Sequence, residues 1–201
     1  QKLDGLPLFP DMRRHKAAIF ARFPTLPAFI AVARLDRPIG IYLLLWPTLW
    51  ALWFAAGGWP GWHLLLVFTL GAIITRSAGC VVNDIVDREF DGEVRRTRGR
   101  PLAQGQLKVE EAFIFMLFLS FIALLLVLST NWLTVLLAVL AAVVAAIYPF
   151  MKRYTYLPQV VLGLAFSMGI PMAFAATSNE IPKLAWLLVV ANLVWTVAYD
   201  T

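Results

Sequence analysis

WHLLLVFTLGAIITRSAGCVV, residues 62–82, is the stretch of sequence that decides the fold. Arg76 is its single charged residue. A helix needs about 20 consecutive apolar residues to cross a hydrocarbon core of roughly 30 Å. The stretch therefore predicts a transmembrane helix that carries one buried cation.

Similar apolar runs fill most of the chain. Of its 201 residues, 61% are hydrophobic and 14% are charged, which is far more apolar than an ordinary soluble domain. We expect an all-α, multi-span bundle of about six transmembrane helices, with the third and sixth short enough to need tilt or local thinning of the bilayer. The six predicted spans cover residues 39–56, 62–82, 112–128, 132–150, 159–176 and 184–198.

Basic residues are distributed unevenly between the connectors. All but two of the 17 Lys and Arg residues lie on one side of the predicted spans, the exceptions being Arg76 and Lys183. The positive-inside rule places that side, and the N-terminus, in the cytoplasm. The formal charge of +5 is therefore explained by topology, and we expect no nucleic-acid partner.

Residues 1–38 are predicted to form a cytoplasmic N-terminal segment. Its part from Asp11 to Ala33 mixes basic and apolar residues, as an interfacial helix on anionic headgroups does. Pro24 and Pro27 would interrupt such a helix.

Acidic residues follow the second span directly, in the order Asn83, Asp84, Asp87 and Asp91. On a continuing helix the three aspartates would lie within about 60° of one another, on one stripe. Carboxylates at helical spacing repel one another and are poorly solvated at a membrane boundary, and a divalent cation removes both penalties. Oxygen-only ligands suit Mg²⁺, so the four residues are candidate metal ligands and the three aspartates candidate catalytic residues.

Two other interpretations of these acidic residues are weaker. A solvated loop that merely ends a span explains exposed glutamates but not charges that emerge straight from an apolar run. An EF-hand loop beginning at Asp87 would have Arg98 at its twelfth position, where a bidentate glutamate is required, so that interpretation fails.

Basic residues near the aspartates are candidate substrate contacts. A run of arginines ends at Arg100, and Lys152 and Arg153 follow the fourth span. Topology explains most basic residues here, yet arginine beside a carboxylate–metal site is also what a diphosphate requires. Arg76 differs because it lies within a span, where an arginine is either functional or snorkels toward the headgroups.

Several motifs, in order along the chain, resemble the UbiA family of intramembrane prenyltransferases. Asn83-Asp84-x-x-Asp87-x-x-x-Asp91 resembles the first aspartate-rich motif of the family. Further stretches resemble its 4-hydroxybenzoate polyprenyltransferase branch: residues 35–40 with 46–50, residues 96–102, and residues 148–155 with 157–159. The resemblance covers the chain from about Arg34 to Thr201.

The resemblance implies a fold, an activity and a location. Family members have nine transmembrane helices and a second aspartate-rich motif. Tyr199-Asp200-Thr201 resembles the opening of that second motif. Residues 39–201 would therefore be an incomplete prenyltransferase domain with a cytoplasmic catalytic loop at 83–111. Such an enzyme uses Mg²⁺ to transfer a polyprenyl group from polyprenyl diphosphate to 4-hydroxybenzoate, ortho to its hydroxyl, in ubiquinone biosynthesis. It would lie in the bacterial inner membrane, the mitochondrial one being the alternative.

The resemblance also assigns roles to residues. Asn83, Asp84, Asp87 and Asp91 would bind metal and diphosphate, while Arg100, Lys152 and Arg153 would contact diphosphate or carboxylate. Asp200 would stand at the edge of the second motif. The chain as given is expected to have little activity, because half of the metal site would be absent.

Three alternatives stay open from the sequence. Another UbiA-family prenyltransferase, of the haem or menaquinone pathway, shares the aspartate motif. A secondary transporter could use carboxylates as an ion site near mid-membrane. A metal-free scaffold protein is the third, and Mg²⁺-dependent transfer would distinguish it from an enzyme.

Overall fold

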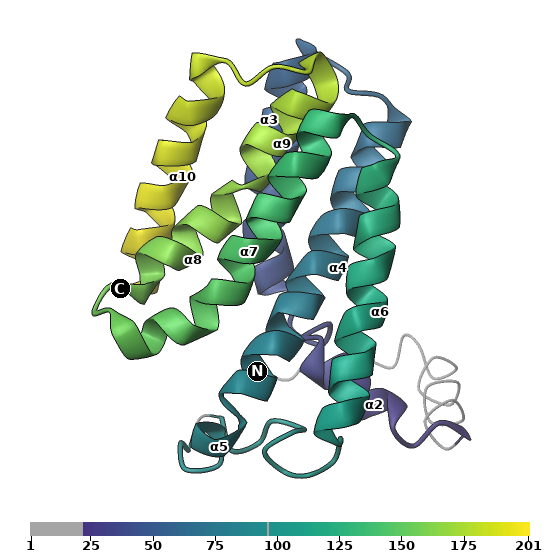
Figure 1. Ribbon diagram of the computed structural model, residues 1–201, viewed down its shortest axis with the longest axis vertical. Coiled ribbons are helices and arrows are strands. Elements are labelled where there is room, and N and C mark those ends of the chain that lie inside the picture. Colours follow the sequence, from purple (N-terminus) through teal and green to yellow (C-terminus); the bar gives the residue numbers. More distant parts are fainter. Residues whose placement is uncertain (1–21, 96) are drawn as a thin grey trace, which may run out of the picture.

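The computed structural model describes residues 22–95 and 97–201, without the side chains of Lys152 and Arg153. Every regular element in this part of the chain is a helix (Figure 1). The helices are α2 (Leu26–Val32), α3 (Ile39–Ala56), α4 (Trp62–Val86), α5 (Arg88–Asp91), α6 (Val109–Leu128), α7 (Trp132–Tyr154), α8 (Pro158–Ser167), α9 (Gly169–Ser178) and α10 (Lys183–Asp200).

Six helical segments are long and apolar enough to cross a membrane, with α8 and α9 together forming one of them. The predicted all-α, multi-span bundle is thus confirmed. The expectation that the third and sixth spans are short was wrong, because α6 has 20 residues and α10 has 18. In α6 the extra turn includes Glu110 and Glu111, which suit a helix N-terminus although they are not apolar.

Membrane-facing surfaces are strongly apolar. Along α6, Phe118 is 57% exposed and Leu125 is 52% exposed, and Ala112 is the residue of this helix that is buried. A helix that is apolar all round and buries so little against protein is suited to lipid rather than water. The protein is therefore a multi-pass membrane protein.

The helix α4 runs the length of the bundle, packed against α3 and α6 (Figure 1). It continues four residues beyond the predicted end, through Asn83 and Asp84. The prediction of one unbroken helix through Asp91 was wrong, since Asp87 adopts φ −88° and ψ 0° between α4 and the short α5. Polar residues end the apolar run without ending the helix, and one turn residue then redirects the chain.

The fifth predicted span is a broken helix. It is interrupted at Met168, between α8 and α9. Pro171 supplies no N–H, and its ring conflicts with the carbonyl of Ser167 four residues earlier, which explains the break. The Ser167 hydroxyl donates to the Gly163 carbonyl at 2.7 Å and accepts from the Asn192 amide of α10 at 2.9 Å.

Two apolar cores lie toward opposite ends of the bundle. The larger one is formed by Ala51, Leu52, Val67, Phe68, Ile170, Ala173, Phe174, Ala185 and Val189, from α3, α4, α9 and α10. The smaller one is formed by Ala28, Val32, Val81, Leu102, Leu107 and Ala112, and it fastens α2 and the α5–α6 connector to α4 and α6.

The N-terminal segment is described from Arg22 onward, so the first half of the predicted interfacial stretch, residues 11–21, lies outside the described residues. Its described helix, α2, starts at Leu26 with Pro27 in its first turn, where proline is tolerated. Phe29 meets Phe115 of α6 edge-on, with ring centroids 5.0 Å apart. This helix therefore packs into the protein rather than resting only on headgroups.

Candidate active site

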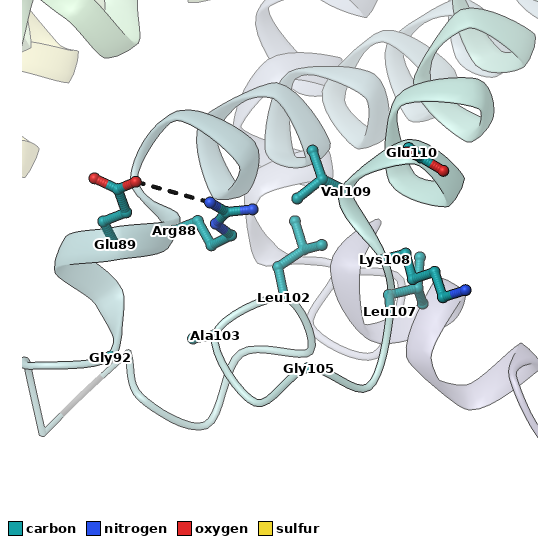
Figure 2. A pocket seen from close by; sticks show the side chains of 10 residues that line it. All are labelled: Arg88, Glu89, Gly92, Leu102, Ala103, Gly105, Leu107, Lys108, Val109 and Glu110. Carbon is teal, nitrogen blue, oxygen red and sulfur yellow. Dashed lines mark ion pairs between the residues drawn. The ribbon is translucent and has the colours of Figure 1, made fainter.

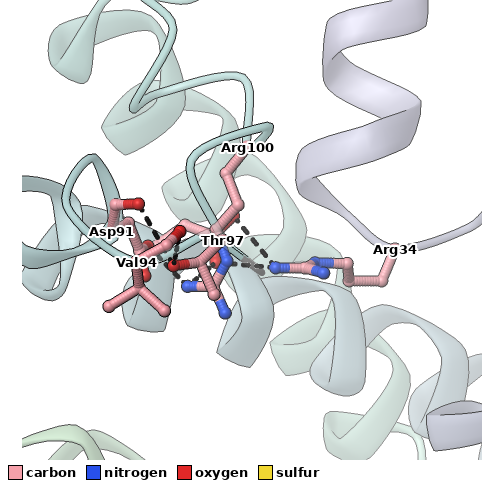
Figure 3. Close-up of polar contacts among 6 residues, drawn as sticks. Arg34, Asp91, Val94, Thr97 and Arg100 are labelled. Atoms are coloured by element: carbon pink, nitrogen blue, oxygen red, sulfur yellow. Dashed lines mark hydrogen bonds and ion pairs between the residues drawn. The ribbon is translucent and has the colours of Figure 1, made fainter.

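Two buried carboxylates converge on one arginine at the end of α4 (Figure 3). Asp84, with its side chain 1% exposed, places Oδ1 3.0 Å from Nη1 of Arg100. Asp91, from α5, places Oδ2 2.5 Å from the same nitrogen. The helical spacing of the two aspartates and the turn at Asp87 thus bring their oxygens to a common point.

Arg34 is a second cation at this point. Its Nη2 lies 3.1 Å from Asp84 Oδ1, and its side chain is 29% exposed. The residue follows α2 and has φ of 57°, a left-handed conformation that a residue with a Cβ adopts at a cost of about 1–3 kcal/mol. Backbone strain at a residue whose side chain reaches a buried charge is typical of a functional position.

The connector between α5 and α6 positions Arg100. The Thr97 hydroxyl donates to the Asp91 carbonyl at 3.1 Å, and the Arg100 N–H donates to the Thr97 carbonyl at 2.9 Å. Leu102 and Leu107 are buried against α2 and α6 just beyond it. These contacts hold the connector over the end of α4.

The donor chemistry at this point fits Mg²⁺. Asp84 and Asp91 offer only oxygen, and their convergence on one nitrogen shows that one cation can contact both. No group of three or more acidic, His or Cys side chains is gathered for a metal among the described residues. Mg²⁺ commonly takes one or two carboxylates and completes its shell with water and substrate phosphate, so Asp84 and Asp91 suit it as protein ligands.

Arg76 lies away from this cluster, in a cradle of its own. Its guanidinium carbon is 5.4 Å from the centre of the Phe166 ring of α8. On another side it lies against Gly40 of α3, where an added Cβ would be 2.7 Å from Nε. The buried Nε has no hydrogen-bond partner among the residues that the structure describes. A buried guanidinium with an unused donor is suited to an anionic ligand.

The remaining predicted residues lie around the cluster or outside the description. Asn83 and Asp87 are partly buried and have further contacts. Asp200 is exposed at the end of α10, close enough for its charge to act on Tyr148 of α7, as do the charges of Arg76 and Asp87. Lys152 and Arg153 belong to the last turn of α7, and their side chains lie outside the described part.

Sequence reasoning missed Arg34 as a site residue. Topology alone accounts for its charge in the sequence, because nothing local connects it with an aspartate 50 residues away. The available signal was its place at the start of the stretch that resembles the family.

A hollow of about 790 Å³ lies on the outer side of the α5–α6 connector (Figure 2). Charges of both signs line it, from Arg88, Glu89, Lys108 and Glu110. Arg88 and Glu89 pair with each other at 3.7 Å. Because Asp84, Asp91 and Arg100 do not line this hollow, it is separate from the buried cluster.

Comparison with known proteins identifies relatives over most of the chain. Residues 44–201 match the sequence model of the UbiA prenyltransferase family. A Pseudomonas aeruginosa protein named 4-hydroxybenzoate octaprenyltransferase is 60% identical over 173 residues, which are 86% of this chain and 58% of that protein. One of the same name from Saccharophagus degradans is 56% identical over 177 residues, 88% of this chain and 59% of that protein. The chain thus spans about three fifths of the length of these relatives.

Solved structures share the fold. A UbiA homolog from Aeropyrum pernix, in its apo form, superposes with a TM-score of 0.70 at 25% identity, over 80% of this chain and 61% of that one. A UbiA homolog from Archaeoglobus fulgidus bound to GPP and Mg²⁺ gives 0.67 at 14% identity, over 86% of this chain and 61% of that one.

Proposed function

Because the chain belongs to the UbiA prenyltransferase family, we propose that the complete protein transfers a polyprenyl group from polyprenyl diphosphate to 4-hydroxybenzoate, ortho to the hydroxyl, in ubiquinone biosynthesis. The observation that carries the proposal is the buried cluster of Asp84, Asp91, Arg34 and Arg100 at the end of a membrane span. The substrates follow from the name that relatives 56% and 60% identical bear. Family membership leaves the transporter and scaffold alternatives without support.

The cluster would hold the diphosphate end of the donor. Arg100 supplies a guanidinium group, which binds phosphate oxygens in pairs, Arg34 holds Asp84, and Asp84 and Asp91 supply ligands for Mg²⁺. When bound, Mg²⁺ would neutralise charge on the diphosphate and so favour its departure. We assign Asn83, Asp87, Lys152 and Arg153 to the surroundings of the same diphosphate, and Asp200 to the edge of a second acidic motif.

Arg76 would hold the carboxylate of 4-hydroxybenzoate. Its buried Nε lacks a partner among the described residues, and Phe166 and Gly40 fix the guanidinium from two sides. Arginine suits this role because its planar fork matches a carboxylate and stays charged when buried.

The transfer breaks the allylic carbon–oxygen bond of the donor and forms a carbon–carbon bond to the ring, which then loses a proton. The pair of electrons in the broken bond leaves with the diphosphate. Apolar residues of the bundle would hold the isoprenoid tail and exclude water, which would otherwise capture the allylic cation.

Orientation follows from charge. We place the aspartate end of α4 on the cytoplasmic side of a bacterial inner membrane, because the basic connectors lie at that end. Cysteines introduced at the exposed positions Gly92 and Gln104 should resist an impermeant thiol reagent added to intact cells, and should react after permeabilisation. Labelling in intact cells would reverse the orientation.

The decisive experiment is an assay of the full-length protein in liposomes with labelled polyprenyl diphosphate, Mg²⁺ and 4-hydroxybenzoate. We expect a prenylated hydroxybenzoate that forms only with all three components. Phenol, which lacks the carboxylate, should be a much poorer acceptor for the native protein. Absence of the product, or equal use of phenol, would contradict the proposed substrate.

A further inference from the structure

The four charges of the buried cluster sum to zero. Two carboxylates, Asp84 and Asp91, face two guanidinium groups, Arg34 and Arg100. Leaving a buried charge unpaired is strongly unfavourable, so the two arginines neutralise the two carboxylates. A divalent cation that arrived alone would give this site an excess positive charge.

Arg100 engages the same two carboxylates that would hold Mg²⁺. Its Nη1 is the atom that lies 3.0 Å from Asp84 and 2.5 Å from Asp91. These carboxylate oxygens would also be the protein's ligands for the ion. Metal and guanidinium therefore compete directly, and Arg100 must withdraw before both carboxylates can bind one ion.

The two arginines differ in what they contact. Among the described residues, Arg34 pairs with Asp84, from a backbone held in a left-handed conformation next to α2, whose Ala28 and Val32 are buried. Arg100 lies in a connector outside the helices and pairs with both carboxylates, so it is the arginine that an ion shared by Asp84 and Asp91 must displace. Leu102 and Leu107 anchor this connector independently of the Arg100 side chain.

A withdrawn guanidinium needs another anion, and the diphosphate of the proposed reaction supplies one. We propose that Arg100 is an exchangeable counter-ion that pairs with the oxygens of Asp84 and Asp91 and passes to the diphosphate when metal and diphosphate arrive together. Arg34 stays on Asp84 throughout. Metal alone then binds weakly and the metal–diphosphate pair binds well, so the protein does not fill its site with an ion in the absence of substrate. This inference rests on the proposed function for the identity of the anion.

The alternative is that Arg100 is a fixed staple that holds the connector over α4. The two roles predict opposite signs for one measurement. An exchangeable counter-ion competes with the metal, so its removal strengthens binding of metal alone. A staple organises the aspartates, so its removal weakens that binding.

The test measures Mn²⁺ binding to the full-length protein in detergent from the signal of the free ion, without any phosphate present. Arg100→Gln should bind Mn²⁺ on the order of tenfold more tightly than the native protein, in the range of ordinary coupling between two ligands. Arg98→Gln is the matched control, because it removes the same charge from an exposed position of the same connector and should change binding little. Thermal unfolding of each variant reports whether the fold is retained, and Arg100→Lys keeps the competing charge if Arg100→Gln unfolds.

A second titration uses inorganic pyrophosphate at saturating Mn²⁺. Arg100→Gln should bind pyrophosphate several-fold more weakly than native protein, which is the reverse of its effect on the metal. Unchanged or weaker binding of Mn²⁺ alone in Arg100→Gln would overturn the exchange and leave Arg100 as a staple. Failure of the native protein to prenylate 4-hydroxybenzoate would instead overturn the proposed substrate, while the sign of the Mn²⁺ effect would still decide the role of Arg100.

Discussion

The two ends of α4 are stabilised by different kinds of interaction. At the Trp62 end, edge-to-face rings of Trp53, Trp59 and Trp62 and a hydrogen bond between His63 and Ser129 accompany the larger apolar core. At the Asp84 end, buried ion pairs stand beside the smaller apolar core. Neutral contacts can be lost one at a time, whereas charges that neutralise each other depend on every member. The Trp62 end therefore maintains the fold, whereas the Asp84 end is less stable so that it can bind a ligand.

The largest expected effect tests the charged end. Asp84→Asn keeps the shape of the side chain but removes its charge. Because a metal ligand is lost, the activation free energy of prenyl transfer should rise by about 4 kcal/mol, which lowers the rate roughly 1000-fold. Turnover of the full-length variant in liposomes measures this. Glu89→Gln removes an exposed carboxylate at the same end and should leave turnover near normal. A small loss in Asp84→Asn would remove the distinction between the two ends.

The next effect tests the neutral end. The Asn131 side chain accepts from the Thr134 N–H at 3.0 Å, which caps α7, and donates to the Ala175 carbonyl at 2.5 Å. Asn131→Ala should lower the free energy of unfolding by about 2 kcal/mol while the folded fraction keeps its turnover. Asn131→Asp retains the cap and loses only the donor, so it should be destabilised less. A loss of activity per folded molecule would show that the ends are not independent.

A substitution at Gly40 examines the arginine that lies between the ends. Gly40→Ala places a Cβ against the mobile end of Arg76, so it should displace the guanidinium without unfolding α3. We expect the KM for 4-hydroxybenzoate to rise about tenfold, corresponding to roughly 1.4 kcal/mol, with little change in kcat. Gly71→Ala on α4 meets nothing within 4 Å and is the matched control. Equal KM values for the two variants would argue against Arg76 as the carboxylate contact.

The smallest expected effect is at His63. The bond from its Nε2 to the Ser129 hydroxyl is 3.1 Å long and exposed. Its loss in His63→Ala should change the free energy of unfolding by no more than about 1 kcal/mol and leave transfer unchanged. A denaturation midpoint far below that of the native protein would show that this end, too, depends on single contacts.

Much of the fold was predictable because the apolar runs and the helix-ending residues between them indicate the same helix bounds. The helix α3 has the predicted bounds, with Gly57 in the left-handed conformation that ends it. The predicted end of α4 was too early and the predicted start of α6 too late, since a polar residue lowers hydropathy without breaking a helix. The break at Met168 was missed although Pro171 was visible, because a span can keep its length and hydropathy across a break.

The candidate site was predictable only where it is local. Helical spacing along one segment predicted that Asp84 and Asp91 lie together, although the turn at Asp87 between them was not predicted. The contact of Arg34 with Asp84 depends on how α2 packs against α4, which no spacing rule encodes. The cradle of Arg76 likewise joins Gly40 and Phe166 from two other helices, so the sequence indicated an unusual arginine but not its neighbours.

The broken helix of α8 and α9 has a consequence for how the protein is assembled in the bilayer. Each half has 10 residues, about 15 Å of helix, so neither can span a membrane by itself. The Ser167 hydroxyl at their junction accepts a hydrogen bond from the Asn192 amide, which belongs to the next span. A helix with a polar break is poorly suited to insertion by itself. A hairpin of α8–α9 with α10 inserts more readily, because the Asn192 amide and the Ser167 hydroxyl then satisfy each other. We therefore expect α8, α9 and α10 to enter the membrane together, so that insertion of the broken helix is completed only after the following span has been made.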